Sequence, residues 1–289
     1  KTTHYAAAAD SDGVVLVEPF AFDNDAPGFA KFISKITSFP KEQLVIGLES
    51  TGIYSENLIC FLFASGYKLA VINPIQTATL RKTNIRKTKT DKVDTLLIIK
   101  SVMVNSYRLY TEQDAHSLKL KSLCRFRQSL KKSKARLKIQ LSGYVNLLFP
   151  ELLSFFKSGI HISTCYTLLK RCSSPAEIAA LRLDSLSRLL SNASRGRFSR
   201  STAEALKSLA KSSVGVKNPY ISIQIAQTIQ QIELLEQQID EIENVIKDTI
   251  CEHDSVIMSI PGIGAIDSAM ILGEIGNIDR FASPAKLLA

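Results

Sequence analysis

The sequence is poor in several residue types that define familiar classes of protein. It contains no tryptophan, three methionines and four histidines, and its five cysteines form no Cys-x-x-Cys pair. This composition argues against a zinc site and a disulfide framework, and indicates reduced thiols in the cytosol. No apolar run approaches the roughly twenty residues that a membrane-spanning helix needs. No segment is therefore expected to cross a membrane.

Positive charge is in excess and unevenly distributed. The chain has 36 lysines and arginines against 27 acids, a net charge of +9. Residues 115–150 contain no acid and nine basic residues: Lys119, Lys121, Arg125, Arg127, Lys131, Lys132, Lys134, Arg136 and Lys138. A run of charge is commonly a solvated helix face. Nine cations without one acid nevertheless favour a nucleic-acid partner, because phosphate neutralisation supplies most non-specific affinity for nucleic acids.

The first third of the chain alternates strand-like and helix-like segments. Apolar runs over residues 4–9 and 14–20 surround a Ser-Asp-Gly turn and predict a β-hairpin. Further elements follow in order: a helix over 26–38, a strand over 44–48, a helix over 54–64, a strand over 67–72 and a helix from residue 91. This order predicts an α/β fold, with a mixed sheet flanked by helices.

Three acids follow or open these elements. Glu49 ends a buried strand, and Asp91 and Asp94 lie three apart in the first turn of a helix. Magnesium prefers carboxylate oxygens, and metal sites that act on phosphodiesters cluster such acids. The alternative is an ordinary helix start favoured by the helix dipole, beside an acid that merely ends a strand. On spacing alone, an ordinary helix start is commoner than a metal site. The neighbouring cations count in favour of a metal site, but they do not make it the preferred interpretation.

The pattern of the remaining two thirds of the chain predicts mostly helices. A long basic helix is predicted over 114–148, short helical pieces lie between 151 and 214, and isoleucines recur every seven residues within 221–250. That recurrence is typical of a coiled-coil seam of roughly four heptads. A tight Pro-Gly-Ile-Gly turn then precedes another helix. The backbone N–H groups of Gly262 and Gly264 could hold a DNA phosphate, or the turn could simply be required between packed helices.

Several of these segments together resemble one family. Residues 47–54 (GLESTGIY), 73–74 (NP), 89–94 (KTDKVD), 259–264 (SIPGIG), 274–276 (EIG) and 281–284 (FASP) are similar, in the same order, to the DEDD transposases of bacterial insertion sequences. This is the one-ten family, which includes the Piv and MooV invertases. The resemblance implies a RuvC-like, RNase H-type domain in which four acids hold magnesium, for which manganese can substitute.

The resemblance also assigns roles to residues. Glu49, Asp91 and Asp94 correspond to the second, third and fourth acids, whereas the first acid falls before Lys1 and the family's serine nucleophile falls beyond Ala289. Asp10, at the hairpin turn, is a poor substitute for the first acid. We therefore expect this chain to lack both groups. The basic residues beside the acids, Lys87, Lys89 and Lys92, would steer or clamp the DNA backbone.

The expected organisation has three parts. They are a RuvC-like catalytic domain with a truncated first strand (1–113), a basic helix with a helical linker region and coiled coil (114–254), and the truncated start of a C-terminal transposase domain (255–289). The expected partners are DNA, a structured guide RNA and further copies of the chain, forming a dimer or tetramer through the coiled coil. The resemblance places the protein in the bacterial cytoplasm, with the nucleoid.

Three functions are compatible with the sequence. The resemblance favours a transposase or site-specific recombinase that cleaves and rejoins DNA strands with a bound metal ion. A structure-selective nuclease would share the acid cluster but would hydrolyse strands without rejoining them. A non-catalytic nucleic-acid-binding remnant would keep the basic surface alone. A covalent link between a serine and DNA would exclude the nuclease.

Overall fold

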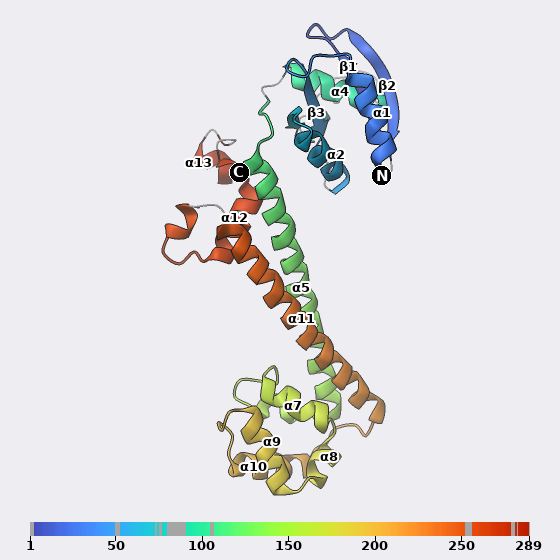
Figure 1. Cartoon of the computed structure of the whole chain (residues 1–289). Helices are drawn as coiled ribbons and strands as arrows, with labels where there is room; N and C mark the ends of the chain where they lie inside the picture. The colour runs from blue at the N-terminus through green and yellow to red at the C-terminus, as the bar shows by residue number, and fades with distance from the viewer. Residues whose placement is uncertain are drawn as a thin grey trace. The chain divides into compact units, whose positions relative to one another are not determined.

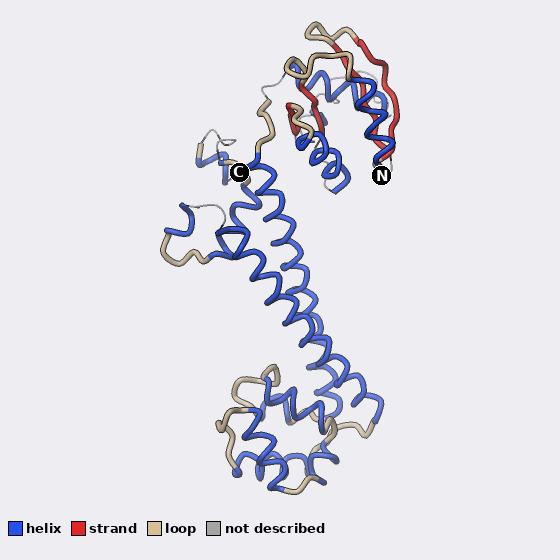
Figure 2. Tube along the Cα trace, in the orientation of Figure 1, coloured by secondary structure: helices blue, strands red, loops and turns tan. Residues whose placement is uncertain are grey.

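The computed structural model describes residues 3–49, 53–72, 74, 77–79, 91–104, 107–251, 256–278, 281 and 283–288. The chain divides into two compact units, one made of Lys1–Ser117 with Gly276–Ala289 and the other of Leu118–Ile275. Among the described residues, all the strands belong to the first unit, and the second is built from helices (Figures 1 and 2). The protein is thus a mixed α/β protein with a large helical part.

The predicted hairpin at the start of the chain is confirmed. Strands β1 (Thr3–Ala9) and β2 (Val15–Asp23) pair antiparallel, with two register shifts near the turn. Asp10 shapes that turn, since its Oδ1 accepts the backbone N–H groups of Asp12 at 3.0 Å and Val14 at 2.9 Å. Gly13 has a φ of 88°, a value that few residues other than glycine adopt.

The next elements also lie where the sequence predicts them. Helix α1 (Ala26–Ile36) precedes β3 (Val45–Glu49), α2 (Ile53–Ala64) and β4 (Lys68–Ile72), and β3 pairs with β4 in parallel. Apolar side chains from β2, α1, β3, α2 and β4 form the core of this unit: Phe22, Phe29, Phe32, Ile36, Leu48, Leu58, Ile59, Leu62 and Leu69. The apolar side chains that recur along each segment are therefore the ones that form the core.

The strands do not form the single mixed sheet that the sequence predicts. Within the described part of the chain, β1 pairs with β2 and β3 pairs with β4, and no ladder joins the two pairs. Helix α4 (Asp91–Val104) packs against strands of both sheets. Strands β1 and β3 both line one cavity of about 680 Å³.

Two long helices dominate the second unit. Helix α5 (Glu112–Leu148) and helix α11 (Pro219–Cys251) run antiparallel. Arg127 pairs with Glu243, whereas Lys134, later in α5, pairs with Glu236, which is earlier in α11. Between them lie α6 (Leu152–Phe155), α7 (Ser163–Arg171), α8 (Pro175–Ala180), α9 (Leu183–Ala193) and α10 (Arg200–Lys211). A 3-10 turn, η1 (Val256–Ser259), and α12 (Ala265–Ile275) follow, and α13 (Pro284–Leu288) belongs to the first unit. No described helix is both long and apolar enough to traverse a membrane.

The heptad isoleucines are buried inside the chain. Ile225, Ile232, Ile239 and Ile246 are each at most 5% exposed. Ile225 and Ile232 pack in one core with Leu141 of α5 and with side chains of the short helices, and Ile246 packs with Leu120 of α5. The seam is therefore covered by the same chain, while the supercoiling that defines a coiled coil stays a prediction.

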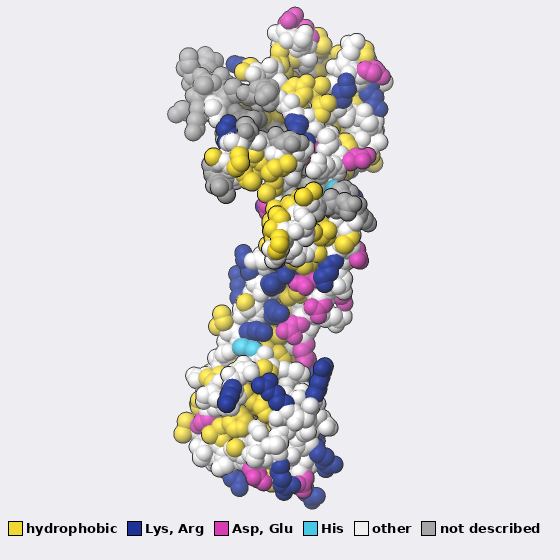
Figure 3. All heavy atoms as spheres, turned by 90° about the vertical axis from the view of Figure 1, so that its left-hand side faces the viewer, with side chains coloured by type: hydrophobic (Ala, Val, Ile, Leu, Met, Phe, Trp, Pro, Cys, Tyr) yellow, Lys and Arg dark blue, Asp and Glu magenta, His cyan; other side chains and the backbone are white. Residues whose placement is uncertain are grey.

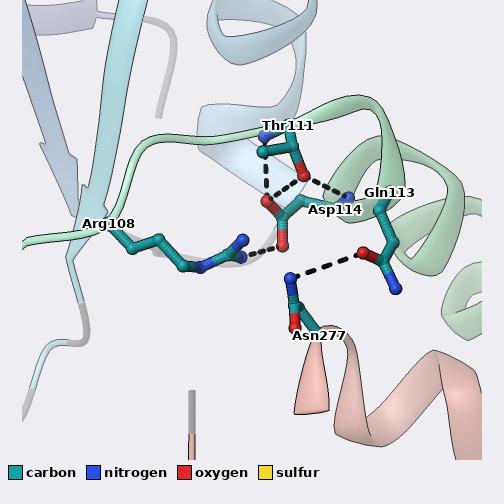
Figure 4. Close-up of polar contacts among 5 residues, drawn as sticks. All are labelled: Arg108, Thr111, Gln113, Asp114 and Asn277. Atoms are coloured by element: carbon teal, nitrogen blue, oxygen red, sulfur yellow. Dashed lines mark hydrogen bonds and ion pairs between the residues drawn. The ribbon is translucent and has the colours of Figure 1, made fainter. Parts of the chain in front are cut away.

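The start of α5 is held by a capping box (Figure 4). The Oδ2 atom of Asp114 accepts hydrogen bonds from the backbone N–H and the hydroxyl of Thr111, at 2.8 and 2.9 Å, and Arg108 pairs with the same carboxylate. The amide of Asn277 donates to Gln113 at 3.4 Å. The contacts of Asp114 fix the first turn of α5. The contact of Asn277 with Gln113 ties the segment after α12 to that turn.

The packing of α4 against β3 predicts opposite effects for two glycine substitutions. A Cβ atom at Gly47 would lie 2.6 Å from Val102 Cγ2 and 3.3 Å from Ile98 Cγ2, whereas one at Gly143, in α5, would have no neighbour within 4 Å. We expect Gly47→Ala to lower the free energy of unfolding by about 1–3 kcal/mol through overpacking. Gly143→Ala should raise it by about 0.5–1 kcal/mol, because alanine favours the helix. Urea denaturation measures both, and equal effects would contradict the close packing of α4.

Candidate metal and nucleic-acid site

Glu49 is held at the end of β3 by a neighbour that the sequence did not single out. The hydroxyl of Thr77 donates to Glu49 Oε1 at 2.7 Å, and it also lies 2.9 Å from the carbonyl oxygen of Pro74. Thr77 is only 2% exposed, so its position is set by packing. A neutral donor of this kind orients the carboxylate and leaves its charge available to a cation. The only sequence signal for Thr77 is its place three residues after a proline that follows a strand.

Two of the three predicted acids line one cavity. Asp94, in the first turn of α4, lines the same cavity as Glu49, together with Ser55 of α2. Asp91 begins α4, but its side chain lies outside the described residues. No group of three or more His, Cys, Asp or Glu side chains in the described part of the chain could hold a metal ion. The donor chemistry nevertheless fits magnesium, which is bound by carboxylates and water.

The predicted cations beside these acids are only partly placed. Lys92 is exposed in the first turn of α4, next to the two aspartates in sequence. Lys87 and Lys89 lie outside the described residues. Asp10 also lines the cavity, but its carboxylate holds the hairpin turn.

Many cations of the basic helix are neutralised by acids from distant parts of the sequence. Arg127 is buried, and its Nε and Nη2 atoms lie 2.7 and 2.6 Å from Glu243 Oε1. Lys134 and Lys138 lie 3.5 and 4.0 Å from Glu236 Oε1. Basic and acidic side chains accordingly lie beside one another over the long helices of this unit (Figure 3). These charges contribute first to the packing of α5 against α11.

Glu274 of α12 binds two more cations of the basic helix. Arg125 donates to both carboxylate oxygens, at 2.7 and 3.0 Å, and Lys121 Nζ lies 3.3 Å from Oε2. The hydrogen bond from Arg125, ahead of the effects of Lys121, lowers the pKa of Glu274. Gly273 permits this approach, since a Cβ there would lie 2.8 Å from the backbone nitrogen of Lys121.

Four cations of α5 have no acidic partner within 4 Å among the described residues: Lys119, Lys131, Lys132 and Arg136. All four are exposed. Lys132 and Arg136 are one helical turn apart, and they continue the face that Lys121 and Arg125 begin, since positions 11 residues apart share a face of an α-helix. Lys132 and Arg136 form the outward stripe of α5, a part of the basic helix that a polyanion could reach.

The glycine turn before α12 is exposed. Gly262 has a φ of 91°, so its backbone conformation favours glycine. Cβ atoms at Gly262 and Gly264 would meet nothing within 4 Å. Packing against other elements therefore does not demand these glycines. Asp267, in the first turn of α12, places a negative charge near the helix start and would weaken phosphate binding there.

Comparison with known proteins gives consistent matches in both halves of the chain. The sequence profile of the transposase family DEDD_Tnp_IS110 matches residues 1–150, a little over half of the chain. The profile of the IS116/IS110/IS902 transposase family matches residues 254–289. A Streptomyces coelicolor protein, "Mini-circle putative transposase for IS117", is 22% identical over 290 residues, which cover 95% of this chain and 69% of the relative.

The contact between Thr77 and Glu49 generates a prediction about metal affinity. Thr77→Val keeps the shape of the side chain but removes the donor to Glu49 Oε1. If Glu49 is a ligand, manganese affinity should fall about tenfold, the effect that loss of an orienting hydrogen bond commonly has. Thr249→Val, which removes an equally local hydroxyl contact on α11, serves as the control and should leave the affinity unchanged. Isothermal titration with Mn²⁺ measures both, and equal affinities would show that the Thr77 hydroxyl serves packing alone.

Proposed function

Since the chain belongs to the DEDD transposases of IS110-type insertion sequences, we propose that its N-terminal unit cleaves and rejoins DNA strands with a bound divalent metal ion. The observation that carries this proposal is that Glu49 and Asp94, from separate elements, both line one cavity. The α/β architecture, with helices packed on the strands, supports an RNase H-like fold for this unit.

Glu49, Asp91 and Asp94 are the proposed metal ligands. Magnesium, or manganese in its place, would stabilise the negative charge that develops on the oxygens of a scissile phosphate. Thr77 orients Glu49, and Asp91 and Asp94 both belong to the first turn of α4 in the sequence. We assign Asp10 to the hairpin turn rather than to the metal, because its carboxylate already accepts two backbone N–H groups. No serine is assigned as the nucleophile.

DNA is the proposed partner of the cations beside the acids and of the exposed cations of α5. Lys87, Lys89 and Lys92 would contact the strand at the acids, and Lys119, Lys131, Lys132 and Arg136 would contact nucleic acid along α5. Arg125, Lys134 and Lys138 could contribute once their acidic partners are displaced, whereas burial and the contact with Glu243 assign Arg127 to packing. A structured guide RNA fits the same outward stripe, since phosphate contacts do not depend on base sequence.

Recombination joins several DNA ends, so we propose that the protein acts as a homo-oligomer. The heptad isoleucines pack against other residues of the same chain. Contact between copies would therefore use the outer faces of α5 and α11. Ile139 and Ile223 are 74% and 57% exposed on these helices, where apolar side chains are free to meet a second copy. The number of copies is left to measurement.

Metal binding tests the proposed acids directly. In a Mn²⁺ titration, the double variant Asp91→Ala, Asp94→Ala should lose saturable binding, and Glu49→Gln should weaken it at least tenfold, because a neutral amide replaces a charged ligand. The matched control Glu18→Ala, Glu42→Ala removes two exposed acids from the same unit and should bind as well as the parent. Equal binding in all variants would leave Asp91 and Asp94 as an ordinary helix start.

DNA joining should depend on the same acids. In an assay of strand transfer, Asp91→Ala should abolish joining while DNA binding persists, and a joining rate equal to the parent's would refute the proposal. Recovery of a covalent link between protein and DNA would support rejoining. Products that are cleaved but never joined would instead indicate a structure-selective nuclease.

The outward stripe of α5 predicts a change in the salt dependence of DNA binding. Each phosphate contact contributes about 0.9 to the slope of log K against log salt concentration. Lys132→Ala, Arg136→Ala should therefore reduce the slope by about 1.8 on non-specific duplex DNA. The control Lys211→Ala, Lys247→Ala removes the same charge from exposed positions of α10 and α11. Equal reductions in both double variants would show that only net charge matters.

A further inference from the structure

The short helices α6 to α10, residues 152–211, form a helical module with a strong excess of positive charge. The module contains ten lysines and arginines and three acids, a net charge of +7, compared with +9 for the whole chain. Helix α11 contains six acids and one lysine, and several of those acids pair with cations of α5. In Figure 3, basic side chains lie over the module with few acids beside them. The excess charge of the second unit therefore lies mainly on the module.

Seven of the ten cations of the module are exposed and have no acid within 4 Å among the described residues. These seven are Lys157, Arg171, Arg182, Arg188, Arg195, Arg197 and Lys211. The other three, Lys170, Arg200 and Lys207, contact acids or a carbonyl oxygen. Like charges on one small domain repel each other and oppose its compact state, an effect that a bound polyanion would reverse.

Helix α9 ends in a turn that places an arginine where glycine is usual. The backbone N–H of Gly196 donates to Ser191 O at 2.8 Å, and that of Arg195 donates to Asn192 O at 3.4 Å, which are the two bonds of a Schellman motif. Arg195 has a φ of 54°, a left-handed conformation that its Cβ atom makes unfavourable. Glycine would stabilise the turn better, so the arginine at this position points to a role for its side chain.

The rest of the turn is anchored to the core of the module. The backbone N–H of Phe198 donates to Ser194 Oγ at 3.0 Å, and its ring packs against Phe156 with a centroid separation of 5.2 Å. Arg195 and Arg197 are exposed on this anchored segment. Their backbone is therefore fixed, while their side chains are open to solvent.

A third arginine lies on the exposed side of α9. Arg188 and Asn192 are both exposed and are four residues apart, so they share one face of the helix, and Arg195 follows three residues later. We call Arg188, Arg195 and Arg197 the basic corner. A guanidinium group can donate two parallel hydrogen bonds to a phosphate, which makes arginine well suited to phosphate recognition.

The composition of the module's surface indicates which polyanion it fits. No large apolar side chain within residues 152–211, all of which the structure describes, is exposed, and the aromatic rings there are buried or half-buried. Helices that bind membrane surfaces insert exposed apolar side chains, and proteins that bind single strands stack bases on exposed aromatic rings. The module offers neither feature. Its surface therefore suits the phosphate backbone of a nucleic-acid duplex.

We propose that the basic corner is a second DNA-binding surface, which contacts backbone phosphates of a duplex without reading its sequence. That the duplex is DNA rests on the function proposed above. The corner is separate from the outward stripe of α5, because α5 ends at Leu148, roughly 18 Å beyond Arg136 at 1.5 Å per residue. A duplex bound at both surfaces is held at two points, which fixes its direction on the second unit.

The salt dependence of DNA binding tests the corner. The full chain and the double variant Arg195→Gly, Arg197→Gln are titrated onto a fluorescent duplex DNA of mixed sequence at several salt concentrations. We expect the slope of log K against log salt concentration to fall by about 1.8, because two phosphate contacts are lost. The control Arg171→Gln, Lys211→Gln removes the same charge from the ends of α7 and α10 and should keep the parent's slope.

Stability separates a lost contact from a damaged fold. Arg195→Gly should raise the melting temperature, because glycine adopts the left-handed conformation without strain, while DNA binding weakens. If the double variant fails to fold, Arg188→Gln, Arg197→Gln leaves the turn intact and should lower the slope by the same amount. The parent's slope in the folded corner variant overturns the proposal. An equal loss in the control also overturns it, since only net charge would then matter.

The same variants are tested on duplex RNA and on vesicles of phosphatidylserine and phosphatidylcholine. A loss of binding confined to the RNA or to the vesicles overturns the proposal in favour of that partner. The stripe variant Lys132→Ala, Arg136→Ala separates this inference from the proposed function. A lower slope in the stripe variant alone overturns only the basic corner, whereas a parent chain that binds no duplex DNA overturns the proposed function as well.

Discussion

Helix α4 connects the two small sheets of the N-terminal unit. The pairs β1–β2 and β3–β4 share no ladder in the described residues, yet α4 packs against strands of both. Its approach to β3 is close enough that a methyl group at Gly47 would meet Val102 at 2.6 Å. Asp94 belongs to the same helix, so the contact that joins the sheets also decides where this carboxylate lies relative to Glu49.

This arrangement links the stability of the unit to its chemistry. Glu49 is positioned by β3 and by a buried threonine hydroxyl, and Asp94 by a helix that rests on both sheets. A change in the separation of the sheets would therefore change the geometry of the carboxylates. Strands β1 and β3 line the same cavity as Glu49 and Asp94, so the site and the packing of the two sheets share one space.

In the helical unit, charge serves packing before it serves recognition. Glu243 and Glu274 lie 116 and 149 residues from the arginines that they bind. A pair such as Arg127 and Glu243 is largely removed from water, and loss of either partner would leave the other charge poorly solvated. The exposed pairs made by Glu274 and Glu236 contribute less to stability. They leave a narrower cationic surface than the sequence of α5 suggests by itself.

The sequence by itself determined the local elements and the candidate acids. The hairpin, the helix starts, the long helices and the positions of Glu49 and Asp94 follow from periodicity, turn residues and caps, which act over a few residues. Tertiary structure decided the remainder: the Thr77 contact to Glu49, the pairing of Arg127 with Glu243, the covering of the heptad isoleucines by α5, and the separation of the strands into two sheets. The physical reason is that these contacts join residues far apart along the chain, and their spacing in sequence carries no information about which edges, faces or charges will meet in space.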